Sequence, residues 1–369
     1  MVRISQSTFL QGLTCLAACA SLVIAAPLPK HVSRDESVPE ESLAPNSPEE
    51  ESLAQSGPPG PPPKRPKLMI IDTDMLNFVD DPLAIGLANI LQTRGEVEIL
   101  GVISSVFSRY VPPAIDAINT YYKHPYIPTA IQKPVNNDLR DPMYPQVNEY
   151  LTGLVNNFPQ DVKDGSLTDQ PVTLYRQLLA KAPPNSVTIA NIGYSDNLYK
   201  LLMSKPDSIS PLTGHELVKQ KVAELVVQAN PEGQSFNFVA HDPKFAIYVM
   251  THWPTLATYV PEAIGSEVLL GARLSKLDLK KNPVAYAFTT IEGVGANTPA
   301  WDSTAVYFAV RGLDDVYTYE RNRGEITFTP DGTASWNYNS PSKLQRSVGL
   351  KIQAGTFAKR IEDLLLLKP

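Results

Sequence analysis

Four aspartates that follow a short apolar run are the first candidates for chemistry in this 369-residue chain. Asp72, Asp74, Asp80 and Asp81 lie within ten positions, directly after the Leu-Met-Ile-Ile run at 68–71. Four like charges in one place repel one another unless a cation or water screens them. Carboxylate oxygens are the usual ligands of hard divalent ions such as Ca²⁺ and Mg²⁺. The pattern indicates a metal site, and a solvated acidic loop that caps the next helix is the alternative.

The residues around these acids predict a strand followed by a helix. An unbroken apolar run such as 68–71 is typical of a strand buried on both faces of a parallel sheet. Pro82 suits the first turn of a helix. Ligands of open parallel sheets bind beyond the carboxyl ends of the strands, so the acids would lie where a ligand site is expected.

The same alternation of strand and helix continues along the chain. It predicts an α/β fold, with an open, mostly parallel central sheet flanked by helices. Strands are expected at 97–106, 127–131, 186–193 and 222–230, helices at 113–122, 173–182, 196–206 and 241–254, and a hairpin at 325–338. Residues 132–165 predict a long loop with one helical piece, and Phe357, Ile361, Leu364 and Leu365 predict one apolar face of a last helix.

The amino-terminal region predicts a secreted protein with a leader. Residues 1–26 combine Arg3, an apolar stretch and small residues before Pro27, as a signal peptide does, and that stretch is too short for a membrane span. Residues 27–66 are rich in Pro, Glu and Ser and are expected to be disordered. Lys64-Arg65 is either a dibasic processing site or a pair of solvated charges. The folded domain is expected at 67–369.

Composition excludes several functions. The formal net charge of −6 argues against a general nucleic-acid binder, which normally carries a basic face. The two cysteines, Cys15 and Cys19, lie inside the expected signal peptide, and five histidines are scattered, so no zinc site is predicted.

Two other motifs compete with the metal reading and fail. Asp72-Thr73-Asp74 after a strand is similar to aspartate-dependent phosphatases, but Leu76 stands where these need Thr or Val. The Gly-Val-Gly-Ala-Asn-Thr segment at 293–298 lacks the third glycine of a dinucleotide loop and does not follow a clear strand.

Read as a whole, the chain resembles the nucleoside hydrolase family, of the inosine/uridine-preferring type and with the longer acidic loop of secreted and bacterial relatives. The acidic loop matches the Asp-x-Asp…Asp-Asp loop that ends the first strand of that family. Other stretches agree in order, over essentially all of 67–369: LGVISS (100–105), PAIDAINTYY (113–122), SVTIANIG (186–193), VAELVV (222–227), FNF with DP (236–243) and TPAWDSTAVYFAVRG (298–312).

The resemblance implies a Ca²⁺ site. Asp74 would bind the ion and take a proton from the attacking water, and Asp81 would be a second ligand. Asp302 would match the distal aspartate of the site, although a helix N-cap is its other reading. The backbone carbonyl of Asp196 would be a further ligand, and Asp72 would support the site from behind.

The resemblance also implies a small-molecule nucleoside as the partner. Asp80 and Asn237 would bind ribose hydroxyls. From its residue type, Trp301 is expected in the core or in a pocket wall, and it could stack on a base if it lies over the site. The implied function is secreted, Ca²⁺-dependent hydrolysis of the N-glycosidic bond of ribonucleosides to ribose and free base. The sequence leaves a homo-oligomer open.

Several positions depart from the family. Ser235 replaces an acid, Ser108-Arg109 replaces Gly-Asn, Gln228-Ala229-Asn230 replaces Met-Gly-Gly, Trp301 replaces a histidine before the distal aspartate, and Phe78 stands where many relatives carry another acid. The metal ligands are thus better preserved than the ribose contacts. The alternative function is a Ca²⁺-binding pseudoenzyme that captures a sugar, a nucleoside or a partner protein.

Overall fold

The computed structural model describes residues 65–369 except 77, 140–148 and 343. The expected signal peptide, and the leader as far as residue 64, lie outside the described residues. Pro63–Pro369 forms one compact unit.

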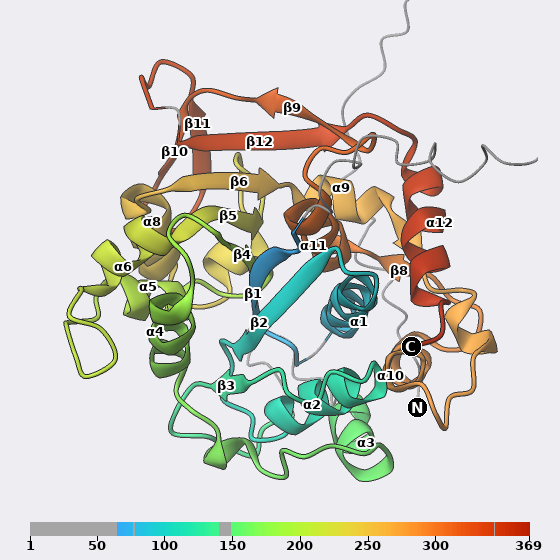
Figure 1. Cartoon of the computed structure of the whole chain (residues 1–369). Helices are drawn as coiled ribbons and strands as arrows, with labels where there is room; N and C mark the ends of the chain where they lie inside the picture. Colours follow the sequence, from blue (N-terminus) through green and yellow to red (C-terminus); the bar gives the residue numbers. More distant parts are fainter. Residues whose placement is uncertain (1–64, 77, 140–148, 343) are drawn as a thin grey trace, which may run out of the picture. The chain divides into compact units, whose positions relative to one another are not determined.

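An eight-stranded sheet runs through this unit in the order β3-β2-β1-β4-β5-β6-β12-β9 (Figure 1). All neighbouring pairs are parallel except β12 with β9. The strands are β1 (Lys67–Thr73), β2 (Val97–Ser104), β3 (Thr129–Ile131), β4 (Val187–Asn191), β5 (Val222–Gln228), β6 (Leu256–Val260), β9 (Tyr317–Arg321) and β12 (Gln345–Leu350). The predicted fold class is confirmed.

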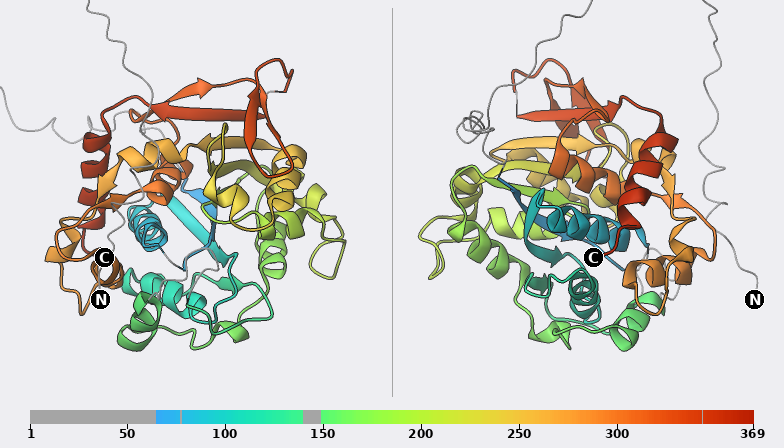
Figure 2. Two further views of the ribbon diagram at one scale, coloured as in Figure 1. Left: turned by 180° about the vertical axis from the view of Figure 1, so that it is seen from behind. Right: turned by 45° about the vertical axis from the view of Figure 1, so that its right-hand side comes forward.

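Helices cover both faces of this sheet, as Figures 1 and 2 show. One face packs against α1 (Asp80–Thr93), α2 (Val111–Tyr121), α3 (Glu149–Asn157), α10 (Pro283–Glu292), α11 (Trp301–Arg311) and α12 (Ala354–Leu365). The other packs against α4 (Pro171–Lys181), α5 (Asp196–Leu202), α6 (Gly214–Lys221) and α8 (Pro243–His252). The short helices α7 (Phe236–Val239) and α9 (Glu262–Glu267) follow β5 and β6.

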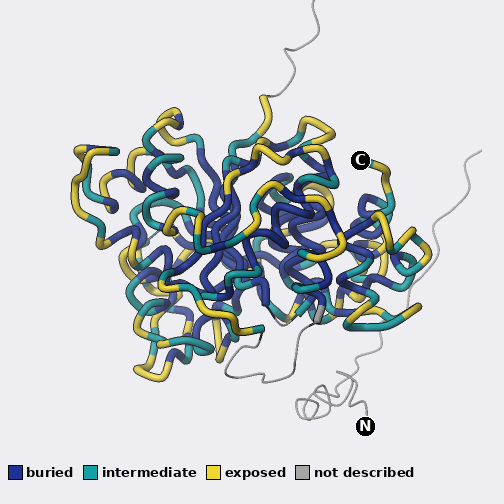
Figure 3. The backbone as a smooth tube through the Cα atoms, turned by 90° about the horizontal axis from the view of Figure 1, so that it is seen from below, coloured by how far each residue is buried: buried dark blue, intermediate teal, exposed yellow. Residues whose placement is uncertain are grey.

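The apolar run of β1 supplies both cores. Met69 and Ile71 join the cluster on the α1 side, and Ile70 joins the cluster on the α4 side. Successive side chains of a strand point to opposite faces, so an unbroken apolar run is what a strand covered on both sides requires. Figure 3 shows the buried backbone concentrated at the centre of the domain, with exposed loops around it.

Most predicted elements are present with shifted ends. The hairpin is β10 (Glu325–Phe328) with β11 (Ala334–Asn337), the helical piece of the long loop is α3, and all four apolar residues of the last helix are buried in α12. The sequence did not predict α6, α10, β9 or β12. A further short pair joins β7 (Leu269–Leu270) to β8 (Thr298–Pro299).

The Gly-Val-Gly segment that begins at Gly293 follows helix α10. Gly293 is the C-cap residue of that helix, with φ of 93°. A dinucleotide loop follows a strand, so this placement agrees with the rejection of that motif. Across the described residues, none of the helices combines the length and apolar character that a bilayer crossing requires.

Candidate metal and ligand site

The candidate site lies at the carboxyl end of β1. In the sheet register, Asp72 stands beside Ile103 of β2 and Asn191 of β4, so three strands end at nearly the same level. The backbone N–H groups of Ser105 and Ile192 donate to the carbonyls of Thr73 and Asp72 at 2.9 and 2.8 Å, which fixes the neighbouring loops to the end of β1. The acids therefore follow a strand end that is held from both sides.

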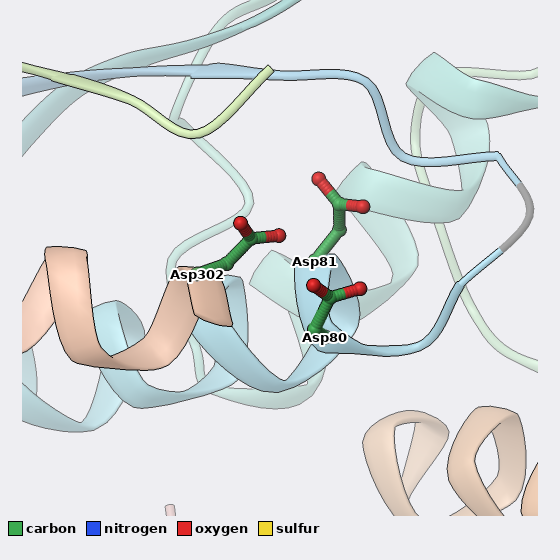
Figure 4. A group of neighbouring side chains, drawn as sticks. All are labelled: Asp80, Asp81 and Asp302. Carbon is green, nitrogen blue, oxygen red and sulfur yellow. The ribbon is translucent and has the colours of Figure 1, made fainter. Parts of the chain in front are cut away.

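Three acids converge here from two helices. Asp80 and Asp81 begin α1, and Asp302 lies in the first turn of α11. One carboxylate oxygen of each lies within 4.8 Å of the others, and all three side chains are buried. Figure 4 shows Asp80 and Asp81 rising from the start of one helix toward Asp302 at the start of the other. We call Asp80, Asp81 and Asp302 the acid cluster.

Burial and mutual repulsion make this cluster unfavourable while all its members are ionised. Burial is the largest cause that raises the pKa of all three acids, to about 7 for Asp80. Neighbouring carboxylates raise the pKa of Asp81 and Asp302 further. The positive ends of α1 and α11, and a hydrogen bond from the Thr73 hydroxyl to Asp81, offset part of this cost.

The donor set fits a hard divalent cation. Three carboxylates supply only oxygen ligands, which Ca²⁺, Mg²⁺ and Mn²⁺ prefer. A cation between them would cancel the repulsion that raises their pKa values. The chemistry of the cluster therefore favours a bound cation over three solvated charges.

Asp74 lies near the acid cluster without being one of the three converging acids. It is partly buried, and its charge raises the pKa of Asp81 and of Asp302. The structure thus brings together Asp81 and Asp302, as the resemblance implied, and places Asp80 beside them; the ribose role of Asp80 stays a prediction. The metal-ligand and general-base roles of Asp74 stay predictions.

Asp72 occupies the supporting position behind the cluster. It is fully buried, its Oδ2 accepts from the Tyr175 hydroxyl at 2.8 Å, and its Oδ1 accepts from the Asn197 amide at 2.9 Å. Burial raises the pKa of Asp72 to about 8. Both oxygens are committed to α4 and α5, so Asp72 ties the end of β1 to these helices. Sequence reasoning missed Tyr175 and Asn197, and no local signal marks either residue.

Asp196 is the first residue of α5, after β4. Its Oδ2 lies 2.7 Å from Nδ1 of His241, and the His241 ring stacks on Tyr194 with 3.9 Å between centroids. Its Oδ1 is buried without a hydrogen-bond partner in the described part of the chain. The side chain is thus engaged with His241, and metal binding through the Asp196 carbonyl stays a prediction.

Asn237 is buried in α7, just beyond β5. Its side-chain amide donates to the carbonyl oxygen of Gln228 at 3.1 Å and to Oε1 of the same residue at 2.9 Å. Gln228 is the last residue of β5, so Asn237 is fixed to the end of that strand. The strand end and α7 are where a contact to a ligand would be expected, and the ribose role of Asn237 stays a prediction.

Aromatic rings adjoin the acid cluster. Trp301 precedes Asp302, its indole N–H donates to Ser266 at 2.9 Å, and its ring meets Phe78 edge to face at 6.4 Å. Phe78 meets Phe236 in the same way at 6.2 Å, and Phe236 contacts Tyr194 at 5.9 Å. Trp301, Phe78 and Phe236 are only partly buried, so they offer apolar surface beside the charged cluster.

Searches of family models and of curated proteins found no match to the chain. Solved structures do match. A plant nucleoside hydrolase, the PpNRh1 enzyme, is 16% identical with a TM-score of 0.56, over 81% of this chain and 98% of that one. An inosine-uridine preferring nucleoside hydrolase from Bacillus anthracis is 15% identical with a TM-score of 0.57, over 81% of this chain and 99% of that one.

A third matching structure is the type III effector protein XopQ in complex with adenosine diphosphate ribose. It is 11% identical with a TM-score of 0.60, over 82% of this chain and 93% of that one. At these identities the likeness concerns the fold. The chain has the nucleoside hydrolase fold.

Proposed function

We propose that this protein is a hydrolase that cleaves the N-glycosidic bond of ribonucleosides with the help of one Ca²⁺. The observation that supports the proposal best is the buried acid cluster at the carboxyl end of β1, within a nucleoside hydrolase fold. A buried set of three acids with raised pKa values is costly for a protein that does not use it.

In the proposed mechanism, Asp80, Asp81 and Asp302 would hold the cation. When bound, the cation would supply positive charge that acidifies a neighbouring water. Asp74 takes the proton of the water as general base. The water oxygen bonds to the anomeric carbon, and the carbon–nitrogen bond breaks with its electron pair going to the nucleobase nitrogen, which takes up a proton from solvent. The sugar passes through an oxocarbenium-like transition state, as in other glycoside cleavage.

Other residues would position the substrate. Asn237 lies in α7, just after β5, and its amide nitrogen donates to Gln228, so its amide oxygen could accept from ribose hydroxyls. Trp301 and Phe78 offer ring faces or edges on which a base can pack. This placement is proposed from the resemblance and from the position of these residues around the acid cluster.

We also propose secretion, on the strength of the signal-peptide pattern in residues 1–26.

A second candidate is a Ca²⁺-binding pseudoenzyme. It is favoured by Ser235 in place of an acid and by Trp301 in place of a histidine, since both changes remove groups that touch or protonate the substrate in relatives. It shares the acid cluster with the first proposal but requires no general base.

Release of free base from a panel of purine and pyrimidine nucleosides, with and without chelator, separates the two. Asp74→Asn keeps the shape and removes the proton acceptor, so release should fall roughly 10²–10⁴-fold. Asp138→Asn, an exposed aspartate in a loop, is the matched control and should keep full activity. If the intact protein binds Ca²⁺ and releases no base from any nucleoside, the pseudoenzyme proposal replaces the first.

A further inference from the structure

The six-residue helix α9 touches two parts of the candidate site. It follows β6 and lies beside α11, as Figure 1 shows. Its first residue, Glu262, binds the loop between β5 and α7. Its Gly265 and Ser266 contact the first residues of α11. None of its residues belongs to the acid cluster.

Glu262 closes the loop that leads to Asn237. One carboxylate oxygen accepts from the hydroxyl of Ser235 and from the backbone N–H of Phe236, the latter at 2.8 Å. The other accepts from the side-chain amide of Asn230 at 3.1 Å. Burial raises the pKa of Glu262, and these three donors oppose that rise. Asn237 follows Phe236 directly.

A carboxylate is the group that this loop requires. All three partners donate, and an ionised carboxylate is the side chain that only accepts. A glutamine at 262 would have one acceptor and one NH₂ donor. Its NH₂ would face either the amide of Asn230 or the donors of Ser235 and Phe236, and the hydrogen bonds on that side would be lost. Gln228 holds Asn237 on the other side, so the loop is fixed at both of its ends.

The same helix fixes the start of α11. The N–H of Ala300 donates to the carbonyls of Gly265 and Val268, both at 3.1 Å, and the Trp301 indole donates to Ser266 at 2.9 Å. A Cβ at Gly265 would lie 2.4 Å from the Cα of Trp301, so helix and chain pack too closely for any side chain there. Asp302 is the next residue.

We propose that α9 fixes the position of Asp302 relative to the loop between β5 and α7, which leads to Asn237. In this proposal Glu262 is the positioning residue for Asn237. The inference rests on the proposed function for its catalytic meaning, because it assigns Asn237 to the sugar and Asp302 to the cation. Glu262 acts through Ser235, Phe236 and Asn230 and need not touch the substrate itself.

Glu262→Gln separates positioning from simple stability. Glu262→Gln should raise KM for a nucleoside roughly tenfold, because it removes a hydrogen bond to a charged group and so weakens the hold on Asn237. We expect kcat to change much less, and the Ca²⁺ affinity measured by calorimetry to stay within about twofold of that of the unchanged protein. Glu267→Gln, an exposed glutamate on the same helix, is the control and should leave all three values unchanged. Glu262→Asp keeps the carboxylate, so it should raise KM less than Glu262→Gln does.

Ser266→Ala tests the other side of α9. It removes the acceptor of the Trp301 indole, so it should weaken Ca²⁺ binding more than Glu262→Gln does. If Glu262→Gln leaves KM unchanged, or if it lowers kcat, Ca²⁺ affinity and the thermal midpoint together, the positioning role is wrong. Equal effects of Ser266→Ala and Glu262→Gln on Ca²⁺ affinity would also overturn it.

A separate readout covers failure of the proposed function. If the intact protein releases no base, hydrogen exchange of the Phe236 backbone N–H is compared between the variants. Faster exchange at Phe236 in Glu262→Gln, with no change in Glu267→Gln, supports the loop-holding role even though hydrolysis is then excluded. Unchanged exchange overturns it.

Discussion

At the scale of single residues, the acid cluster that could bind a cation also lowers the stability of the fold when it is ionised. The pKa values of Asp80, Asp81 and Asp302 are all raised in the folded chain. For an acid, a raised folded-state pKa means that stability is lost as pH rises through the usual aspartate pKa of 3.8 toward the folded-state pKa. Near pH 7 and without a cation, the cluster therefore opposes folding.

Asp302→Asn should reveal this cost. Without its third acid the cluster repels less, so the chelated variant should have a higher thermal midpoint than the chelated unchanged protein. Ca²⁺ at about 100 times its Kd should stabilise the unchanged protein by about 2.7 kcal/mol and the variant by clearly less. Differential scanning calorimetry at pH 7 measures both. A lower midpoint for chelated Asp302→Asn would mean that the carboxylate is a structural hydrogen-bond acceptor instead.

The free energy of unfolding should depend on the hydrogen-bond donors of Asp72. Tyr175→Phe leaves one oxygen of a fully buried carboxyl without its partner, at a cost of about 1–3 kcal/mol in the free energy of unfolding. Tyr126→Phe removes a hydroxyl from a side chain that is 70% exposed and should change that free energy little. Urea unfolding of the two variants gives the comparison. Equal values for both would show that Asp72 is satisfied without Tyr175.

The residues of the site were predictable where a strand end or a family motif marks them. Asp81 and Asp302 come together as the resemblance implied, and Asp80 joins them because it opens the same helix as Asp81. Tyr175 and Asn197 were not predictable, since they lie 103 and 125 positions from Asp72 and only the fold brings them to it. Glu262 was missed for the same reason.

At the scale of elements, apolar runs and helix caps account for most of what the sequence predicted. The strands β1, β4 and β5 are apolar and central in the sheet, so their pattern is unambiguous. The strand β12 has the sequence Gln-Arg-Ser-Val-Gly-Leu and lies next to the edge strand. Its polar residues interrupt the apolar pattern by which a buried strand is predicted. The helix α10 could have been found, because Asn282 caps it and Pro283 opens it.

Two helical glycines should respond in opposite directions to alanine. A Cβ at Gly86 in α1 would lie 2.9 Å from Cγ2 of Val284 in α10, a stiff β-branched side chain, so Gly86→Ala should destabilise by about 1–3 kcal/mol. A Cβ at Gly355 in α12 meets nothing within 4 Å, so Gly355→Ala should stabilise by up to about 1 kcal/mol. Urea unfolding curves measure both. Stabilisation by Gly86→Ala would mean that α10 moves away at little cost.

At the scale of the whole molecule, the order of the strands explains why one site can draw on distant parts of the chain. The sheet places β1 between β2 and β4, and β5 and β6 follow outward. The loops after β1, β4, β5 and β6 therefore open on one edge, because these strands are parallel. Asp302 reaches that edge on α11, which packs over the same face as α1.

Behind this edge, α1 and α2 meet through a buried polar contact that should make stability depend on pH. Nδ1 of His124 lies 2.9 Å from Oδ1 of Asn89, whose amide donates to Asn119 at 2.9 Å. Burial lowers the pKa of His124 below the usual histidine value of 6.5. The folded chain thus favours neutral His124, and its contribution to stability is complete above pH 6.5 and lost as pH falls toward the lower folded-state pKa.

His124→Gln removes this titration while it keeps a polar side chain beside Asn89. The unfolding free energy of the unchanged protein should therefore fall more steeply between pH 7 and pH 5 than that of the variant. Carboxylates, the acid cluster included, titrate in both proteins, so the difference between the two curves isolates His124. His215→Gln, an exposed histidine at the start of α6, should follow the unchanged protein throughout. Parallel curves for His124→Gln and the unchanged protein would mean that His124 is as easily protonated in the folded chain as in the unfolded one.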